Sequence, residues 1–89
     1  MKAVVTVVGK DRVGIIANVC VKLAEFNVNV LDISQTVMQG YFTMMMVVDV
    51  SGCSLPLAEL CRRMEAKGLE MGLSIRVQRE DIFEAMHRV

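Results

Sequence analysis

Aromatic side chains and net charge are both scarce in this chain of 89 residues. Only 4% of the residues are Phe, Trp or Tyr, and the ten Lys and Arg residues are balanced by ten Asp and Glu residues. Proteins that bind nucleic acid usually carry a basic excess, and those that bind single strands stack bases on aromatic rings. A solvating or buffering protein would carry an acidic excess. The composition therefore predicts a protein that does neither.

Long apolar runs are also missing. No run approaches the ~20 residues needed to cross a bilayer, and the apolar stretch near the N-terminus is short and soon interrupted by charged residues, unlike a secretory signal. The three cysteines are odd in number and show no Cys-x-x-Cys spacing, as expected for reduced thiols. We therefore expect a cytoplasmic location without membrane contact.

The length and the 54% hydrophobic content predict one folded domain, residues 1–89.

The residue types needed for catalysis or metal binding are few. His87 is the only histidine, and no cysteine or hydroxyl is placed beside it by sequence spacing. The glycine-containing segment 9–14 lacks both the G-K-[ST] ending of a Walker motif and the G-x-G-x-x-G pattern. The sequence therefore predicts no enzyme activity, no metal and no cofactor.

The first half of the chain shows a strand, a helix and a hairpin. The β-branched run 3–8 predicts a central strand buried on both sides. Apolar residues at helical spacing predict a helix over about 12–26, with Asp11 as its N-cap and Asn27 at its end. Alternating residues then predict strands at 28–39 and 41–50, joined by a turn at Gln39-Gly40.

The second half repeats the helix and strand. Ser54 can cap a helix with Pro56 in its first turn and Gly72 at its end, and residues 73–79 alternate as a strand. Residues 80–89 predict a short C-terminal helix. The order βαββαβ predicts an α+β, ferredoxin-like fold: a four-stranded antiparallel sheet in the order 4-1-3-2, with two helices on one face. The core would span residues 1–79 and the helical tail residues 80–89.

The sheet face without helices would carry apolar side chains. The predicted alternation places on it Val30, Met38, Tyr41, Met45 and Val47. An exposed apolar patch of this kind usually marks an interface, so we expect a homodimer with two-fold symmetry. The alternative is that the C-terminal helix folds back over this face.

The segment between the first strand and the first helix is the strongest candidate for a binding site. Gly9 ends a strand and Gly14 lies in the first turn of the predicted helix, where unpaired backbone amides attract carboxylates or phosphates. A glycine there also allows a ligand to come close. The alternative is a capped turn, in which Asp11 bonds the helix amides and Arg12 is solvated.

Asn29 begins the predicted second strand. Because a helix connects that strand to the first one, residue 29 should lie far from residue 11 of the same chain. It could approach the segment 9–14 of a neighbouring chain, so a site that used both would be an interchain site. The alternative is a turn residue that bonds the local backbone.

Three segments resemble the ACT domain, and together they cover nearly the whole chain. They are GKDRVGIIANVCVKLAEFNVNVLDISQ, GYFTMMMVVDV and LEMGLSIRV. The chain is most similar to the small stand-alone ACT-domain proteins of bacteria and archaea. This resemblance implies a regulatory module of βαββαβ fold that binds a free amino acid between two domains.

The resemblance also implies roles for individual residues. Asp11 would bind the amino group of the ligand, backbone amides near Gly14 and Ile15 would bind its carboxylate, and Asn29 would complete the site across the interface. The chain departs from many amino-acid-binding members at Gly9, where they have a polar residue, often His, and at Val13, where they have Pro. The candidate ligand-binding residues are Asp11, Arg12, Val13, Gly14, Ile15 and Asn29.

These features predict a regulatory module that acts as a homodimer and binds a small molecule. The small molecule expected is an amino acid. A regulated enzyme or a transcription partner would be a separate protein. The alternative is a non-catalytic interaction subunit that binds a larger partner through its exposed sheet face, without a ligand.

Overall fold

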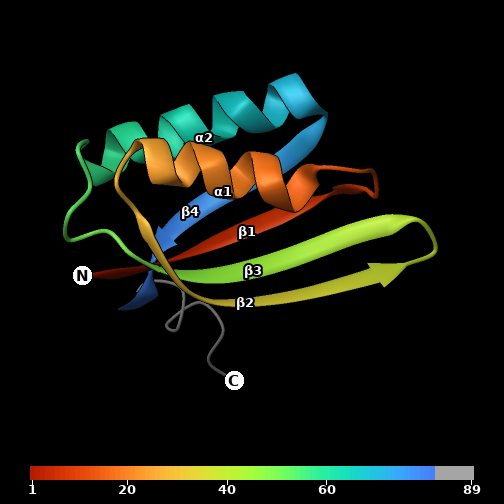
Figure 1. Cartoon of the computed structure of the whole chain (residues 1–89), viewed down its shortest axis with the longest axis horizontal. Helices are drawn as coiled ribbons and strands as arrows, with labels where there is room; N and C mark the ends of the chain where they lie inside the picture. The colour runs from red at the N-terminus through yellow and green to blue at the C-terminus, as the bar shows by residue number, and fades with distance from the viewer. Residues whose placement is uncertain (82–89) are drawn as a thin grey trace.

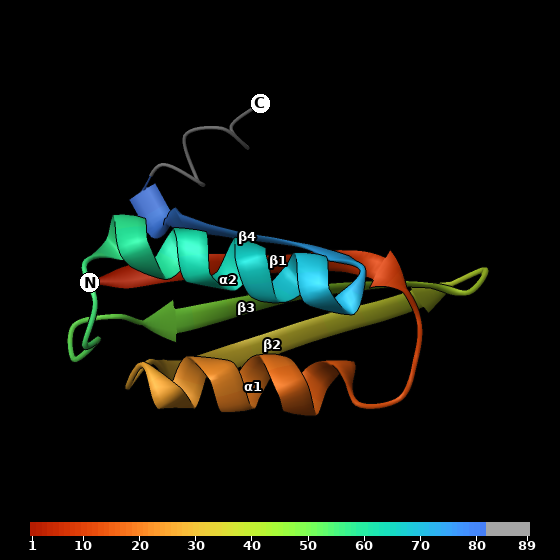
Figure 2. The ribbon, with the colours of Figure 1, turned by 90° about the horizontal axis from the view of Figure 1, so that it is seen from above.

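The computed structural model describes residues 1–81. Its elements are β1 (Lys2–Lys10), α1 (Ile15–Glu25), β2 (Asn29–Met38), β3 (Tyr41–Asp49), α2 (Leu57–Met71) and β4 (Leu73–Arg79). The strands form one antiparallel sheet in the order β2-β3-β1-β4, which confirms the predicted topology. Both helices lie on one face of the sheet (Figure 1), with α2 near β4 and α1 near β2 when seen from above (Figure 2). Of the expected C-terminal helix, residues 82–89 lie outside the described residues.

The hydrophobic core lies between the helices and the sheet. Every second residue of β3, from Phe42 to Val48, points toward the helices and is buried, as the alternation predicted. The core residues supplied by the other elements are Ala3, Val5 and Val7 of β1, Leu73, Ile75 and Val77 of β4, Ile15, Val19 and Leu23 of α1, and Leu60 and Met64 of α2. β1 is central but is not buried on both sides along its whole length, because Val4 is buried on the helix-free side whereas Val8 is 43% exposed.

A bulge in β2 corrects one expectation about the helix-free face. The register with β3 shifts between Val30 and Asp32, so an extra residue, Leu31, stands at that point. Val30 therefore pairs with buried Val48 and faces the helices, and its predicted place on the helix-free face is wrong. The apolar residues that do lie on the helix-free face are Val4, Val8, Met38, Tyr41, Met45 and Val47.

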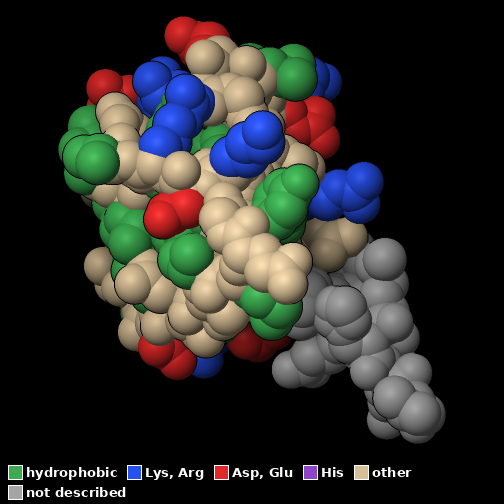
Figure 3. All heavy atoms as spheres, turned by 90° about the vertical axis from the view of Figure 1, so that its right-hand side faces the viewer, with side chains coloured by type: hydrophobic (Ala, Val, Ile, Leu, Met, Phe, Trp, Pro, Cys, Tyr) green, Lys and Arg blue, Asp and Glu red, His purple; other side chains and the backbone are tan. Residues whose placement is uncertain are grey.

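The start of α1 differs from the prediction as well. The helix begins at Ile15, and Gly14, not Asp11, is its N-cap, with a left-handed backbone at φ 89°. Asp11 instead uses its backbone amide, which donates to the carbonyl of Gly40 at 2.8 Å. This bond ties the β1–α1 loop to the turn of the β2–β3 hairpin, and both lie at the end of the molecule that Figure 3 views. The predicted turn at Gln39-Gly40 is confirmed, and both residues have positive φ.

The start of α2 lacks the predicted cap. Pro56 precedes the first helical residue, no side chain caps the helix, and Ser54 bonds elsewhere: its amide donates to the carbonyl of Phe26 at 2.9 Å. The two predicted helix ends are confirmed, because Asn27 after α1 and Gly72 after α2 both have positive φ.

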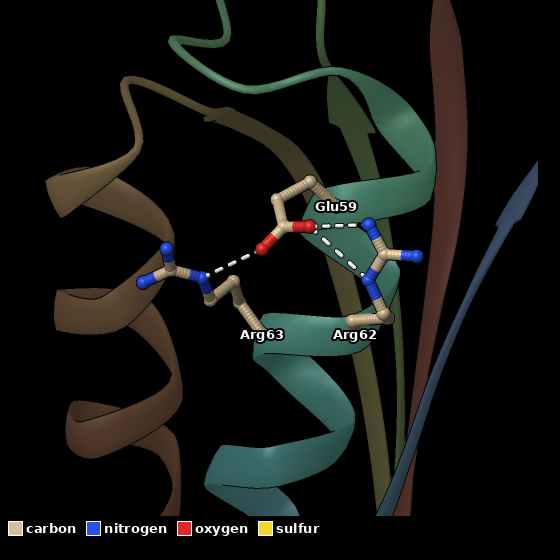
Figure 4. Close-up of polar contacts among 3 residues, drawn as sticks. All are labelled: Glu59, Arg62 and Arg63. Carbon is tan, nitrogen blue, oxygen red and sulfur yellow. Dashed lines mark hydrogen bonds and ion pairs between the residues drawn. The ribbon is translucent and has the colours of Figure 1, made fainter.

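Glu59 is an acidic residue in the otherwise uncapped first turn of α2. It accepts hydrogen bonds from Nε of Arg62 at 3.1 Å and from Nε of Arg63 at 3.0 Å (Figure 4). These bonds, first from Arg62 and then from Arg63, hold the pKa of the Glu59 carboxyl below its usual value. A carboxylate in this position also interacts favourably with the helix dipole.

We expect Glu59→Gln to lower the free energy of unfolding at neutral pH. Because the folded-state pKa of Glu59 is lowered, the stabilisation by the carboxylate is present above the usual pKa of Glu and is lost as pH falls through the lowered folded-state value. Chemical denaturation of both proteins across this range should show their difference vanish in acid. Glu65→Gln, later in the same helix, is the control, and an equal pH dependence in that variant would contradict the prediction.

Candidate functional site

A cavity of about 240 Å³ lies where α1 begins. Four of the six residues expected to bind a ligand line it, and the sequence reasoning missed the other three. The lining residues are Asp11, Arg12, Gly14 and Ile15, together with Ile16, Ala17 and Phe42. The cavity thus combines a carboxylate, a guanidinium and an apolar wall at the N-terminus of a helix.

The first turn of α1 has no side-chain cap. No side chain caps the helix, and its first turn contains no acidic residue, so its first amides keep their hydrogen-bonding capacity and the positive end of the helix dipole is not neutralised there. Asn18 fixes the turn, because its backbone amide and its side-chain Nδ2 donate to the carbonyl of Gly14 at 2.9 and 2.7 Å. A Cβ at position 14 would lie 3.2 Å from that Nδ2, so Gly14 also leaves room for the bond.

The two charged residues of the loop have different surroundings. Among residues 1–81, no side chain is bonded to the Asp11 carboxylate, which is therefore open to a ligand. The guanidinium of Arg12 lies beside Gly72 at the C-terminal end of α2, with Nη2 3.6 Å from where a Cβ on Gly72 would be. A cation near a helix C-terminus is favourable, so Arg12 bridges the site and the end of the second helix.

Phe42 forms part of the apolar wall. It is the second residue of β3 and pairs directly with Gly9, the next-to-last residue of β1. The alternation of residues along β3 predicted that Phe42 faces the helices. Its position beside α1 depends on the register between β1 and β3, which the sequence did not predict. Ile16 and Ala17 follow Ile15 in the first turn of α1, so extending the candidate segment by two residues would have included them.

Val13 and Asn29 do not line this cavity. Val13 is fully exposed. Asn29 pairs with Asp49, which pairs with Lys2, at the opposite end of the sheet from the loop. Eight residues of β1 separate that end from Lys10, or roughly 27 Å at the rise of an antiparallel strand. The structure thus agrees that Asn29 and Asp11 of one chain cannot share a site.

Gly9 is closely packed against Leu73 of β4. A Cβ on this residue would lie only 2.4 Å from Cδ2 of Leu73, whose side chain is buried. The space that a side chain at position 9 would take is therefore filled by Leu73. A ligand in this cavity would meet no side chain at position 9, and the loop backbone and Asp11 would supply its polar contacts.

We expect Gly9→Ala to destabilise the fold by about 1–3 kcal/mol, because the added methyl overpacks a filled site. Chemical denaturation measures the change. In a Leu73→Ala background the same substitution should cost much less, since the colliding side chain has gone. An equal cost in both backgrounds would show that the clash with Leu73 is not the cause.

The thiol of Cys61 is hydrogen-bonded and half-buried. Cys61 donates from Sγ to the carbonyl of Val77 at 3.2 Å, and burial raises the pKa of its thiol. A raised pKa favours the protonated, unreactive form of the thiol.

No helix within residues 1–81 is long and apolar enough to span a membrane.

Comparison with known proteins gives one consistent family. A family model described as ACT domain matches residues 2–78. A UPF0237 protein of Listeria innocua is 52% identical over 89 residues, which is all of both chains. One from Methanocaldococcus jannaschii is 48% identical, covering 99% of this chain and 98% of its own. Among solved structures, an ACT domain protein from Streptococcus pneumoniae has a TM-score of 0.83 and 48% identity, covering 98% of each chain.

Proposed function

Because this chain belongs to the ACT-domain family, we propose that it is a regulatory module that binds a free amino acid at the N-terminus of α1 and acts as a homodimer. ACT domains are generally small-molecule-binding regulatory modules. The observation that carries the proposal is the cavity at the start of α1, where uncapped helix amides and the Asp11 carboxylate line the same space. An α-amino acid presents the complementary pair of charges.

The cavity supports one orientation of the ligand. Its carboxylate would bind the backbone amides near Gly14 and Ile15, and its ammonium group would bind Asp11. The ligand side chain would then lie against the apolar wall that includes Ile16 and Phe42. A volume of about 240 Å³ is below the ~300–1,000 Å³ of pockets for drug-sized molecules, which suits a ligand of few atoms.

The free edge of β2 supports a second subunit. Every residue of this ten-residue strand except Val30 is exposed, and Asp32 is its only charged residue. Leu31, Ile33 and Val37 add apolar surface along it. The opposite edge, β4, is shorter and carries two arginines, a common way to prevent pairing with other strands. β2 is therefore the better edge for pairing with a second copy.

Antiparallel pairing of two β2 strands would also complete the site. In that arrangement the start of one strand lies beside the end of the other. Asn29 of one subunit would then lie near Met38 of its partner, at the end of the sheet where the partner's β1–α1 loop binds the hairpin turn. A ligand in the cavity could thus contact both subunits. Its binding would be linked to dimer stability, which gives the module a means of regulating a separate enzyme or transcription partner.

We expect at least one of the twenty amino acids to raise the melting temperature in a thermal-shift screen. A ligand present at 100 times its Kd adds about 2.7 kcal/mol to the stability of the folded state. Asp11→Ala and Asn29→Ala should each abolish the shift, because they remove the ammonium partner and the contribution of the second subunit. Glu25→Gln, at the far end of α1, should keep it. No shift with any amino acid, with a larger protein recovered as partner, would instead favour the interaction subunit.

We expect light scattering to give a mass of twice 9.9 kDa at micromolar concentration. Ile33→Lys should shift the protein toward the monomer, because it places a charge on the apolar edge of β2. Thr43→Lys is the matched variant on the helix-free face and should remain dimeric. If Thr43→Lys dissociated the dimer and Ile33→Lys did not, the interface would lie on that face instead.

A further inference from the structure

Arg12 lines the cavity at the start of α1 and takes no part in the ligand contacts of the proposed function. Those contacts use the backbone amides near Gly14 and Ile15, the Asp11 carboxylate and the apolar wall. Within residues 1–81, no carboxylate forms an ion pair with Arg12, although Asp11 is its neighbour in sequence. The positive charge of Arg12 is therefore available to a group on the ligand.

The end of α2 positions the guanidinium of Arg12. Nη2 lies 3.6 Å from where a Cβ on Gly72 would be, and Gly72 ends α2 with a left-handed backbone. The last turn of α2 contains no basic residue, so Arg12 supplies the cation that is favourable at this negative end of the helix dipole. A guanidinium has five N–H donors in a planar fork. Contact with the helix end therefore leaves donors for a second acceptor.

The charges around the cavity are unequal in number. The uncapped start of α1 and the Arg12 guanidinium both attract anions, whereas the Asp11 carboxylate attracts a cation. An amino acid with an apolar side chain has one carboxylate and one ammonium group, so it would leave one of the two anion-binding groups without a partner. An amino acid with a second carboxylate in its side chain complements all three.

The apolar wall of the cavity is compatible with an acidic side chain. The two methylene groups of glutamate can pack against Ile16 and Phe42, which leaves the terminal carboxylate for a polar group of the loop. Asp11 and Arg12 are the only charged residues that line the cavity within the described part of the chain, and Asp11 would repel a carboxylate. A guanidinium binds a carboxylate through two parallel hydrogen bonds, which makes Arg12 the matching partner.

We propose that the ligand is an acidic α-amino acid and that Arg12 determines this preference by binding the side-chain carboxylate. This inference rests on the proposed function, because it assigns the class of ligand for the same cavity. Arg12 is then a specificity-determining residue, and the bound side chain connects the β1–α1 loop to the end of α2 through it.

The test compares glutamate with glutamine in calorimetric titrations of the full-length protein. The two amino acids are nearly equal in size and differ in the charge of the side chain. We expect glutamate to bind at least about tenfold more tightly, because charge-assisted hydrogen bonds are stronger than neutral ones. Equal or tighter binding of glutamine or methionine would overturn this inference and leave the proposed function intact. Failure of every amino acid to bind would overturn both.

Substitutions at position 12 supply a second readout. Arg12→Met removes the charge but keeps an unbranched side chain, so it should weaken glutamate binding about tenfold while glutamine binding, which reports an intact cavity, stays unchanged. Arg12→Glu should favour lysine over glutamate, because the charge is reversed. Lys10→Met is the matched control, since Lys10 is a basic residue near the loop that does not line the cavity. Equal weakening of glutamate binding by Arg12→Met and Lys10→Met would show that general attraction, and not Arg12, causes the preference.

Discussion

The pairing of β1 with β3 is the constraint on which the rest of this structure depends. It places Gly9 opposite Phe42 and Lys10 opposite Tyr41, so the β1–α1 loop leaves the sheet beside the hairpin turn. The bond from the Asp11 amide to the Gly40 carbonyl then fixes the loop there. A shift of this register by one residue would turn the core side chains of β3 to the other face and separate the loop from the wall that Phe42 provides. The core and the candidate site therefore depend on the same strand pairing.

The small size of the domain accounts for its unfinished surfaces. A domain of this length buries a smaller fraction of its surface than a larger one, and two helices cover only one face of four strands. Apolar side chains are consequently left along the β2 edge and on the helix-free face. A second subunit at the β2 edge, as proposed, would bring a new residue to the cavity at the start of α1.

The candidate site relies on the backbone more than on side chains. Gly14 adopts a left-handed conformation at the start of α1, where no side chain caps the helix, and Leu73 fills the space that a side chain at position 9 would occupy. In the proposed site, a fixed loop and an uncapped helix end would bind the ligand carboxylate, and Asp11 would add the charge complementary to its ammonium group. This organisation is consistent with the proposed binding of a small zwitterion.

The sequence by itself determined the order of elements, the alternation of β3 and β4, the helix ends at Asn27 and Gly72, and the four candidate residues that line the cavity. These follow from local patterns, because side-chain periodicity and left-handed caps depend on neighbouring residues. Tertiary structure decided the rest. Asp11 gave its amide to the hairpin turn and did not cap α1, the bulge turned Val30 toward the helices, and the register placed Phe42 in the cavity. Each of these results from pairing between segments distant in sequence, which no local pattern encodes.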